Sequence, residues 1–240
     1  MRDYLEARRN FSREVLEREL LAGSLDSGVN ACFECCDRWA DGGRVALEWI
    51  GRGGDRESVT FAALREDAIR CANLLTRCGI ARGDVVASLL PRIPELLTVV
   101  LAIWRIGAIY QPLFTAFGPR AIEQRVTAAG GSRAKLIVTD AVNAAKLGEV
   151  ADCPPVLVVG HGAQDFAEEL AAQPTRFDPI MLRSSDPFIL IFTSGTTGPP
   201  KGVLYPLRFL LPVAVYMETD STYSRATGSG TSPIPAGAMG

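Results

Sequence analysis

Histidine and long apolar runs are both scarce in this sequence. The single histidine among 240 residues, His161, lies between two glycines in an expected loop. The most apolar stretches, 96–104 and 209–217, are interrupted by charge too soon to cross a bilayer. The charged N-terminus lacks the apolar region that directs secretion. These absences predict a soluble, cytoplasmic protein.

Neither sign of charge is in large excess. The net charge is −2, with 48% apolar and 22% charged residues, which is typical of a globular protein. A chain of this length can form a substantial core. A near-neutral chain has no general attraction to nucleic acid or to an anionic membrane, so we expect neither as a partner. The sequence indicates no oligomeric state.

Cysteine is present without the spacing of a metal site. Cys32, Cys35 and Cys36 form a cluster, but no second pair follows at zinc-site spacing and His161 is far away. The cluster falls in an expected helix, so we interpret its members as small buried apolar residues and expect no metal site. Cys71 and Cys78, on an amphipathic helix, receive the same interpretation.

The most informative stretch is 188–203, FILIFTSGTTGPPKGV. Its first five residues are apolar or favour β-structure and predict a buried strand. That strand leads directly into a loop of hydroxyls, glycines and one lysine. The candidate phosphate-binding residues in this loop are Thr193, Ser194, Gly195, Thr196, Thr197, Gly198 and Lys201.

Such a loop can bring several donors to one anion. Gly195, Gly198 and Gly202 are expected to adopt positive φ and bring backbone N–H groups close to a ligand. The hydroxyls are further donors, and Lys201 adds a mobile positive charge. The Walker A pattern is not met, because Lys201 is followed by Gly202 where Ser or Thr is required. From composition alone, a polar surface turn is the alternative.

The string TSGTTGPPKG at 193–202 resembles the signature phosphate loop of the adenylate-forming, or AMP-binding, enzymes. These include acyl-CoA synthetases, peptide-synthetase adenylation domains and luciferases. In that family the loop holds the β- and γ-phosphates of ATP while a carboxylate attacks the α-phosphorus. The resemblance implies ATP, Mg²⁺ and coenzyme A as cofactors and a small-molecule carboxylic acid as substrate. An acyl-adenylate and pyrophosphate would form first, and acyl-CoA second.

The rest of the chain alternates between expected strands and helices. A helical opening at 4–21 and 31–40 precedes a hairpin at 45–50 and 58–61, and Thr60 caps a long helix that stops at Gly79. Strands are then expected at 85–90, 108–113, 135–139, 156–159 and 188–192, and helices at 94–106, 119–129, 141–147 and 165–172. This alternation predicts an α/β fold with a largely parallel sheet and helices on both faces. Ligands of such sheets bind at the carboxyl ends of strands, where Thr193 falls.

Weaker motifs extend the resemblance over 30–217. They are VTFAAL at 59–64, RIGAIYQPL at 105–113 and SRAKLIVTD at 132–140. The resemblance implies the N-terminal part of the large domain of an adenylate-forming enzyme. The run QPLFTAFGP at 111–119 is most similar to acetyl- and other short- to medium-chain acyl-CoA synthetases, which implies acetate or a similar acid as substrate.

Later motifs of the family do not occur in the sequence. They are an adenine and Mg²⁺ motif, a ribose-binding aspartate, a hinge, and a small domain with the lysine of the adenylation step. The catalytic residues are therefore unassigned, and Lys201 is the loop lysine only. Phosphoryl chemistry needs metal, in-line positioning and charge compensation together, so we expect a truncated, inactive fragment of an acid–CoA ligase. A pseudoenzyme or non-catalytic nucleotide-binding fragment is the alternative.

Three regions are expected along the chain. They are a helical lead-in at 1–29, a partial AMP-binding large domain at 30–217 and a flexible tail at 218–240, rich in Ser, Thr, Gly and Pro. Codons for 219–240 can be chosen so that another frame reads RLDLQPGDRFWNIADPGWGYG, which resembles the segment after the phosphate loop in these synthetases. A frameshift near 217–219 is one hypothesis for the tail, and a low-complexity linker is the other.

Overall fold

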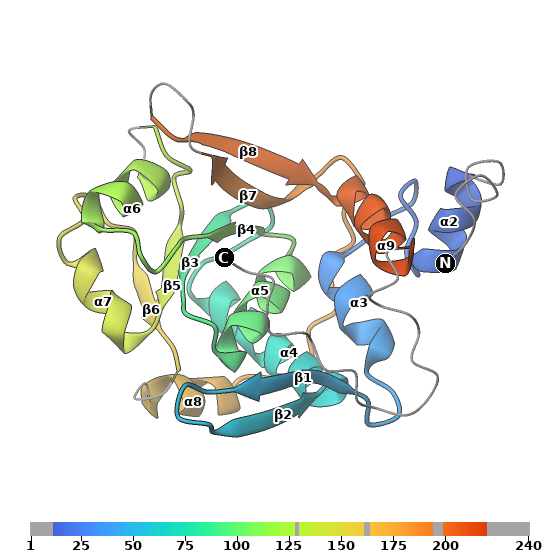
Figure 1. The fold of residues 1–240 in the computed structure, drawn as a ribbon, viewed down its shortest axis with the longest axis horizontal. Coiled ribbons are helices and arrows are strands. Elements are labelled where there is room, and N and C mark those ends of the chain that lie inside the picture. The colour runs from blue at the N-terminus through green and yellow to red at the C-terminus, as the bar shows by residue number, and fades with distance from the viewer. Residues whose placement is uncertain (1–11, 128–129, 161–163, 194–198, 220–240) are drawn as a thin grey trace. The chain divides into compact units, whose positions relative to one another are not determined.

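The computed structural model describes residues 12–127, 130–160, 164–193 and 199–219 (Figure 1). The chain divides into two compact units. The larger is Ala22–Arg208, and the smaller combines Met1–Leu21 with Phe209–Gly240.

A six-stranded sheet forms the centre of the larger unit, in the order β6-β5-β3-β4-β7-β8. All neighbours are parallel except β7 and β8, which pair antiparallel. The strands are β3 (Val85–Leu89), β4 (Ile109–Pro112), β5 (Leu136–Thr139), β6 (Val156–Val158), β7 (Pro187–Thr193) and β8 (Lys201–Pro206). The prediction of a largely parallel sheet is confirmed.

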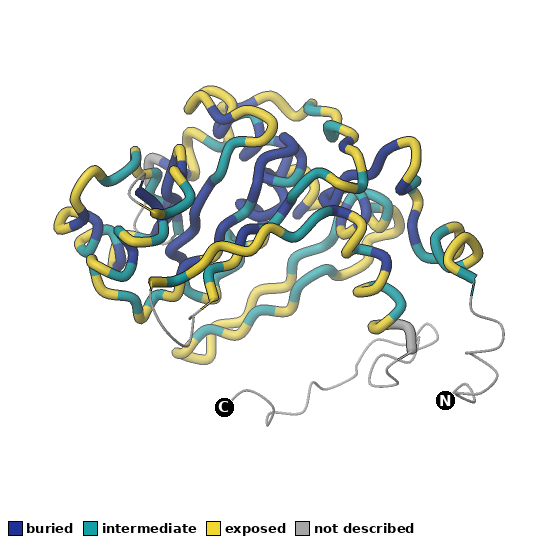
Figure 2. The backbone as a smooth tube through the Cα atoms, turned by 90° about the horizontal axis from the view of Figure 1, so that it is seen from above, coloured by how far each residue is buried: buried dark blue, intermediate teal, exposed yellow. Residues whose placement is uncertain are grey.

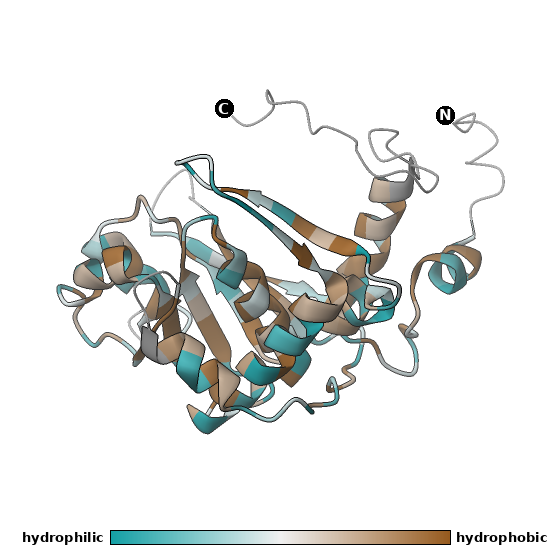
Figure 3. Ribbon diagram, turned by 90° about the horizontal axis from the view of Figure 1, so that it is seen from below, coloured by the Kyte–Doolittle hydropathy of each residue, from teal (hydrophilic) through white to brown (hydrophobic). Residues whose placement is uncertain are grey.

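Helices cover both faces of this sheet, as the sequence predicts. One face packs against α4 (Phe61–Arg77), α5 (Pro94–Ile106) and α8 (Gln164–Ala171), and the other against α6 (Pro119–Val126) and α7 (Ala141–Leu147). Neighbouring residues of one strand point to opposite faces: Val86 joins the first core and Ala87 the second. Figure 2 shows the buried central strands in dark blue, and Figure 3 shows their apolar residues in brown.

The helix boundaries follow from local chemistry. Thr60 caps α4, its hydroxyl accepting a hydrogen bond from the backbone N–H of Ala63. After α4, Gly79 has a φ of 86° and Ile80 N–H bonds to the carbonyl of Leu75, which closes the helix end. Gly107, with φ of 76°, ends α5 in the same way.

The residues before the sheet form a hairpin and a short helix. Strands β1 (Val45–Ile50) and β2 (Arg56–Thr60) pair antiparallel, as predicted. Asn30 caps α3 (Ala31–Cys35), but the predicted helix 31–40 is too long. It breaks at Cys36 (φ −133°, ψ −62°), and a 3₁₀ turn follows at Asp37–Trp39. The turn places Asp37 against Arg105 of α5, a buried ion pair that a straight helix need not form.

The smaller unit contains α2 (Arg13–Leu20) and α9 (Leu210–Thr219). The expected helix at 4–21 is therefore seen from its second half onward, and residues 4–11 lie outside the described part. In α9, Leu211 is buried, whereas Val213, Tyr216 and Met217 are exposed.

The cysteines divide between core and surface. Cys32, Cys36 and Cys71 are buried as predicted, but Cys35 and Cys78 are exposed, so their assignment to the core is wrong. Cys78 caps the end of α4, beyond the apolar stripe that Cys71 shares. Among the described residues, no helix is both long and apolar enough to cross a membrane.

Candidate functional site

The loop identified from the sequence joins β7 and β8 into a hairpin. The predicted strand is confirmed as β7, but β8 was not anticipated. Its first residues, KGV, follow two prolines and carry a glycine, so local propensity favours a loop there. Pairing with β7 overrides it: Ile191 lies opposite Val203, Phe192 opposite Gly202 and Thr193 opposite Lys201.

The hairpin is less buried than the sequence suggests. Phe188 and Leu190 are in the core, but Ile191 is exposed. On β8, Val203 and Leu204 are exposed as well. Strand β8 is at the edge of the sheet, and its apolar residues are less covered than those of the central strands.

Thr193 and Lys201 form the last pair of the hairpin before the loop. The Thr193 hydroxyl donates to the backbone carbonyl of Lys201 at 3.4 Å, and both residues are exposed. Within the described residues, no carboxylate lies within 4.0 Å of the Lys201 ammonium. The two strands thus bring a hydroxyl and an uncompensated positive charge to the carboxyl end of the sheet.

The remaining candidates, Ser194, Gly195, Thr196, Thr197 and Gly198, lie outside the described residues. Of the seven residues predicted to bind phosphate, the structure therefore places two, Thr193 and Lys201. The other assignments stay predictions.

Gly202 has a role different from the one predicted. Its φ is not among the positive ones, so it gives the loop no special backbone conformation. A Cβ at this position would instead lie 3.0 Å from Leu190 Cδ1 and 3.3 Å from Phe192 Cζ. The glycine makes room for two side chains of β7 and thereby holds the hairpin together.

A buried polar pair supports the strand beside β7. The hydroxyls of Tyr110, on β4, and Ser88, on β3, are 3.0 Å apart. Burial raises the pKa of Tyr110, and the hydrogen bond with Ser88 offsets part of that rise. Tyr110 pairs with Ile189 of β7, so this neutral contact helps to fix the position of the strand that carries Thr193.

The sequence analysis missed an exposed aromatic at the same edge. Phe114 lies four residues beyond Tyr110, as Thr193 lies four residues beyond its partner Ile189. Its side chain is 73% exposed, and its ring is 5.8 Å from that of Phe117, over which the Arg125 guanidinium stacks at 4.3 Å. The sequence did contain a signal for this exposed aromatic surface, because two phenylalanines, Phe114 and Phe117, follow strand β4 closely. They place an apolar, cation-backed surface beside the polar hairpin.

Comparison with known proteins identifies the family. The protein-family model described as "AMP-binding enzyme" matches residues 36–230, which is most of the chain. The chain belongs to the AMP-binding enzyme family. Within this family, it is 35% identical over 208 residues to an acetyl-coenzyme A synthetase of Streptomyces avermitilis, covering 75% of the chain and 31% of that protein. An acetyl-coenzyme A synthetase of Bacillus subtilis is 35% identical over 189 residues, covering 74% and 32%.

Two solved structures share the fold. The crystal structure of a Brucella canis acyl-CoA synthetase has a TM-score of 0.84 at 46% identity, covering 90% of this chain and 40% of that one. ATP-bound MatB from Rhodopseudomonas palustris has a TM-score of 0.67 at 27% identity, covering 79% and 37%. The chain spans about a third of the length of the curated relatives that it matches. The fold and family expected from the sequence are confirmed.

Proposed function

We propose that the protein acts as an AMP-dependent acid–CoA ligase, which activates a carboxylic acid with ATP and passes the acyl group to coenzyme A. The observation that carries this proposal is the pairing of Thr193 with Lys201 at the carboxyl end of β7, in a chain that belongs to the AMP-binding enzymes. Ligands of open α/β sheets bind at this edge.

The described end of the loop fits a polyphosphate. The Lys201 ammonium is exposed and unpaired within the described residues, so it can approach phosphate oxygens without first breaking a salt bridge. When bound, ATP would supply the adenylyl group, Mg²⁺ would offset phosphate charge and coenzyme A would accept the acyl group. The ATP in the MatB structure supports the proposal of ATP as the nucleotide. The proposal of Mg²⁺ and coenzyme A is based on membership of the family alone.

For the acid, we propose acetate or another short- to medium-chain carboxylate. The names of the relatives support this choice, since they are acetyl-coenzyme A synthetases. The similarity of 111–119 to short- and medium-chain synthetases supports it too.

We expect the 240 residues alone to bind ATP without turnover, because the family's later motifs do not occur in them. A non-catalytic nucleotide-binding role is the second candidate. Exposed apolar residues of β7 and β8 favour it for the isolated chain, since Ile191 and Val203 on one face of the hairpin and Leu204 on the other are uncovered beside the site. Carboxylate-dependent exchange of labelled pyrophosphate into ATP separates the two when it is measured on a longer chain that also carries the later motifs: exchange there supports the ligase, and ATP binding without exchange supports the second role.

A matched pair of lysine variants tests the loop. Lys201→Ala should weaken ATP binding about tenfold or more, because a charge-assisted contact contributes about 1.5–3 kcal/mol. Lys135→Ala makes the same change just before β5, at the amino edge of the sheet, where Lys135 pairs with Asp84. It should leave ATP affinity unchanged. Equal affinities for Lys201→Ala and the unmodified chain, measured by titration calorimetry, would contradict the assignment.

A further inference from the structure

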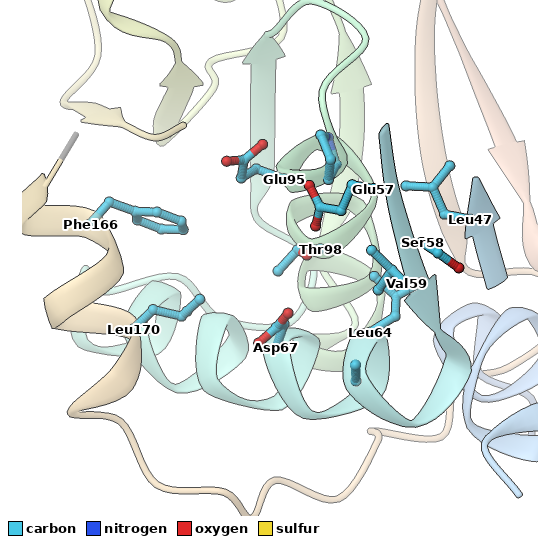
Figure 4. Close-up of a pocket in the computed structure, with 12 residues that line it drawn as sticks. Leu47, Glu57, Ser58, Val59, Leu64, Asp67, Glu95, Thr98, Phe166 and Leu170 are labelled. Carbon is cyan, nitrogen blue, oxygen red and sulfur yellow. The ribbon is translucent and has the colours of Figure 1, made fainter. Parts of the chain in front are cut away.

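A cavity lies between the β1–β2 hairpin and the helices α4, α5 and α8. Its volume is about 310 Å³. Figure 4 shows apolar side chains on two opposite sides, Phe166 and Leu170 facing Leu47, Val59 and Leu64. Such walls suit the methylene groups of a ligand.

Three carboxylates from three different elements line the same cavity. Glu57 comes from β2, Asp67 from α4 and Glu95 from α5, and no basic side chain is among the lining residues. Within the described residues, none of the three has a salt-bridge or side-chain hydrogen-bond partner. Arg70 offsets part of the charge of Asp67, and Glu57 is exposed, so the three carboxylates together make the cavity negative and favour a cationic ligand.

Thr98 gives an independent indication of a ligand. It is only 6% exposed and lines the cavity from the second turn of α5. Its hydroxyl has no hydrogen-bond partner in the part of the chain that the structure describes. Figure 4 shows Glu57 and Glu95 on one side of Thr98 and Asp67 on the other. The hydroxyl is not one of the fully buried atoms that lack a partner, so it is open to the cavity and can accept a hydrogen bond from a ligand there.

The surroundings of the carboxylates differ. Glu95 is in the first turn of α5, near the positive end of the helix dipole. Burial raises the pKa of Asp67, and the charges of Glu66 and Glu57 raise it further, while Arg70 opposes the shift. A cation in the cavity would relieve this repulsion.

The spacing of the carboxylates restricts the ligand. Among the described residues, no three carboxylate, thiol or imidazole groups are close enough to hold one metal ion. A ligand that meets all three must therefore carry separate positive charges joined by an apolar chain. We propose that this cavity binds an aliphatic polyamine, with its ammonium groups at Glu57, Asp67 and Glu95, one of them donating to the Thr98 hydroxyl, and its methylenes along the apolar walls. The site is independent of the proposed ligase function.

Titration calorimetry of the chain with three amines, without nucleotide and at fixed ionic strength, tests this proposal. Spermidine and 1,4-diaminobutane should bind with saturation, and butylamine, which has the same carbon chain but one charge, at least tenfold more weakly. Glu95→Gln and Glu57→Gln should each weaken diamine binding about tenfold, and Thr98→Val severalfold. Glu149→Gln removes the same charge from an exposed residue that does not line the cavity, and it should change nothing.

Three results would overturn the proposal. They are butylamine binding as tightly as the diamine, Glu149→Gln weakening binding as much as Glu95→Gln, and no saturable binding of spermidine by the folded chain. Circular dichroism establishes folding of each variant. Glu57 is exposed on a hairpin, so Glu57→Gln should not prevent folding. This variant therefore tests the proposal even if Thr98→Val is unstable.

Discussion

The indole nitrogen of Trp104 donates a hydrogen bond of 3.0 Å to the backbone carbonyl of Phe188. It joins the last turn of α5 to the beginning of β7, and the two rings are also in contact, with centroids 5.5 Å apart. Because β7 leads to Thr193, this contact fixes the strand on which the candidate site depends.

Trp104→Phe should lower the free energy of unfolding by about 1–2 kcal/mol. The substitution keeps an aromatic ring but removes the donor to Phe188. Urea unfolding measures the loss, and hydrogen exchange should show the largest change in β7. Trp39→Phe is the matched control, since Trp39 Nε1 also donates to a backbone carbonyl, that of Glu34, outside the sheet. Faster exchange in β7 for both variants alike would contradict this role of Trp104.

Gly202→Ala should destabilise the chain by about 1 kcal/mol or more, because the added methyl group would crowd Leu190 and Phe192. Gly148→Ala is the control. Gly148 has a φ of −63°, and an added Cβ there makes only an ordinary contact at 3.6 Å, so this change should be neutral or slightly stabilising. Equal thermal midpoints for the two variants would show that the space beside Gly202 is not needed.

Arg105→Met should cost about 3–5 kcal/mol, since it leaves the buried carboxylate of Asp37 without its main partner. Arg105 is 1% exposed and also donates to the carbonyl of Phe177 at 2.7 Å. Arg82→Met removes an exposed ion pair with Asp186 and should cost at most about 1 kcal/mol. Chemical denaturation separates the two. Similar losses would mean that the Asp37 pair contributes no more than a surface one.

Alkaline pH should destabilise the chain through Cys71. Burial raises the pKa of Cys71 to about 12, whereas a thiol in an unfolded chain ionises near 8.5. The folded state therefore holds the proton longer, so this contribution is intact below about pH 8.5 and is lost as the pH rises towards 12. Cys71→Ala should show a shallower decline of unfolding free energy between pH 8 and 10 in urea titrations. Parallel curves for the two proteins would refute the assignment.

The sequence was sufficient for most of the sheet and its helices, because alternating apolar segments and cap residues such as Thr60 and Gly107 act locally. The sequence was insufficient where the local structure depends on a contact with another part of the chain. Strand β8 exists only because β7 pairs with it, and the break after Cys36 accompanies the ion pair between Asp37 and Arg105. The loop was recognisable from its residue types, whereas the exposure of Phe114 depends on tertiary packing.

Strand β8 differs from the other strands of the sheet in how it can separate from its neighbour. Parallel strands are linked through long crossovers, whereas β7 and β8 are consecutive, with Thr193 and Lys201 paired only eight positions apart. Such a hairpin forms on a microsecond timescale, and its edge strand can separate and return while the other five stay paired. Thr193 and Lys201, at the two ends of the proposed phosphate loop, are therefore held by a strand pairing that opens at its own rate. A bound ligand that contacts both residues would slow this opening.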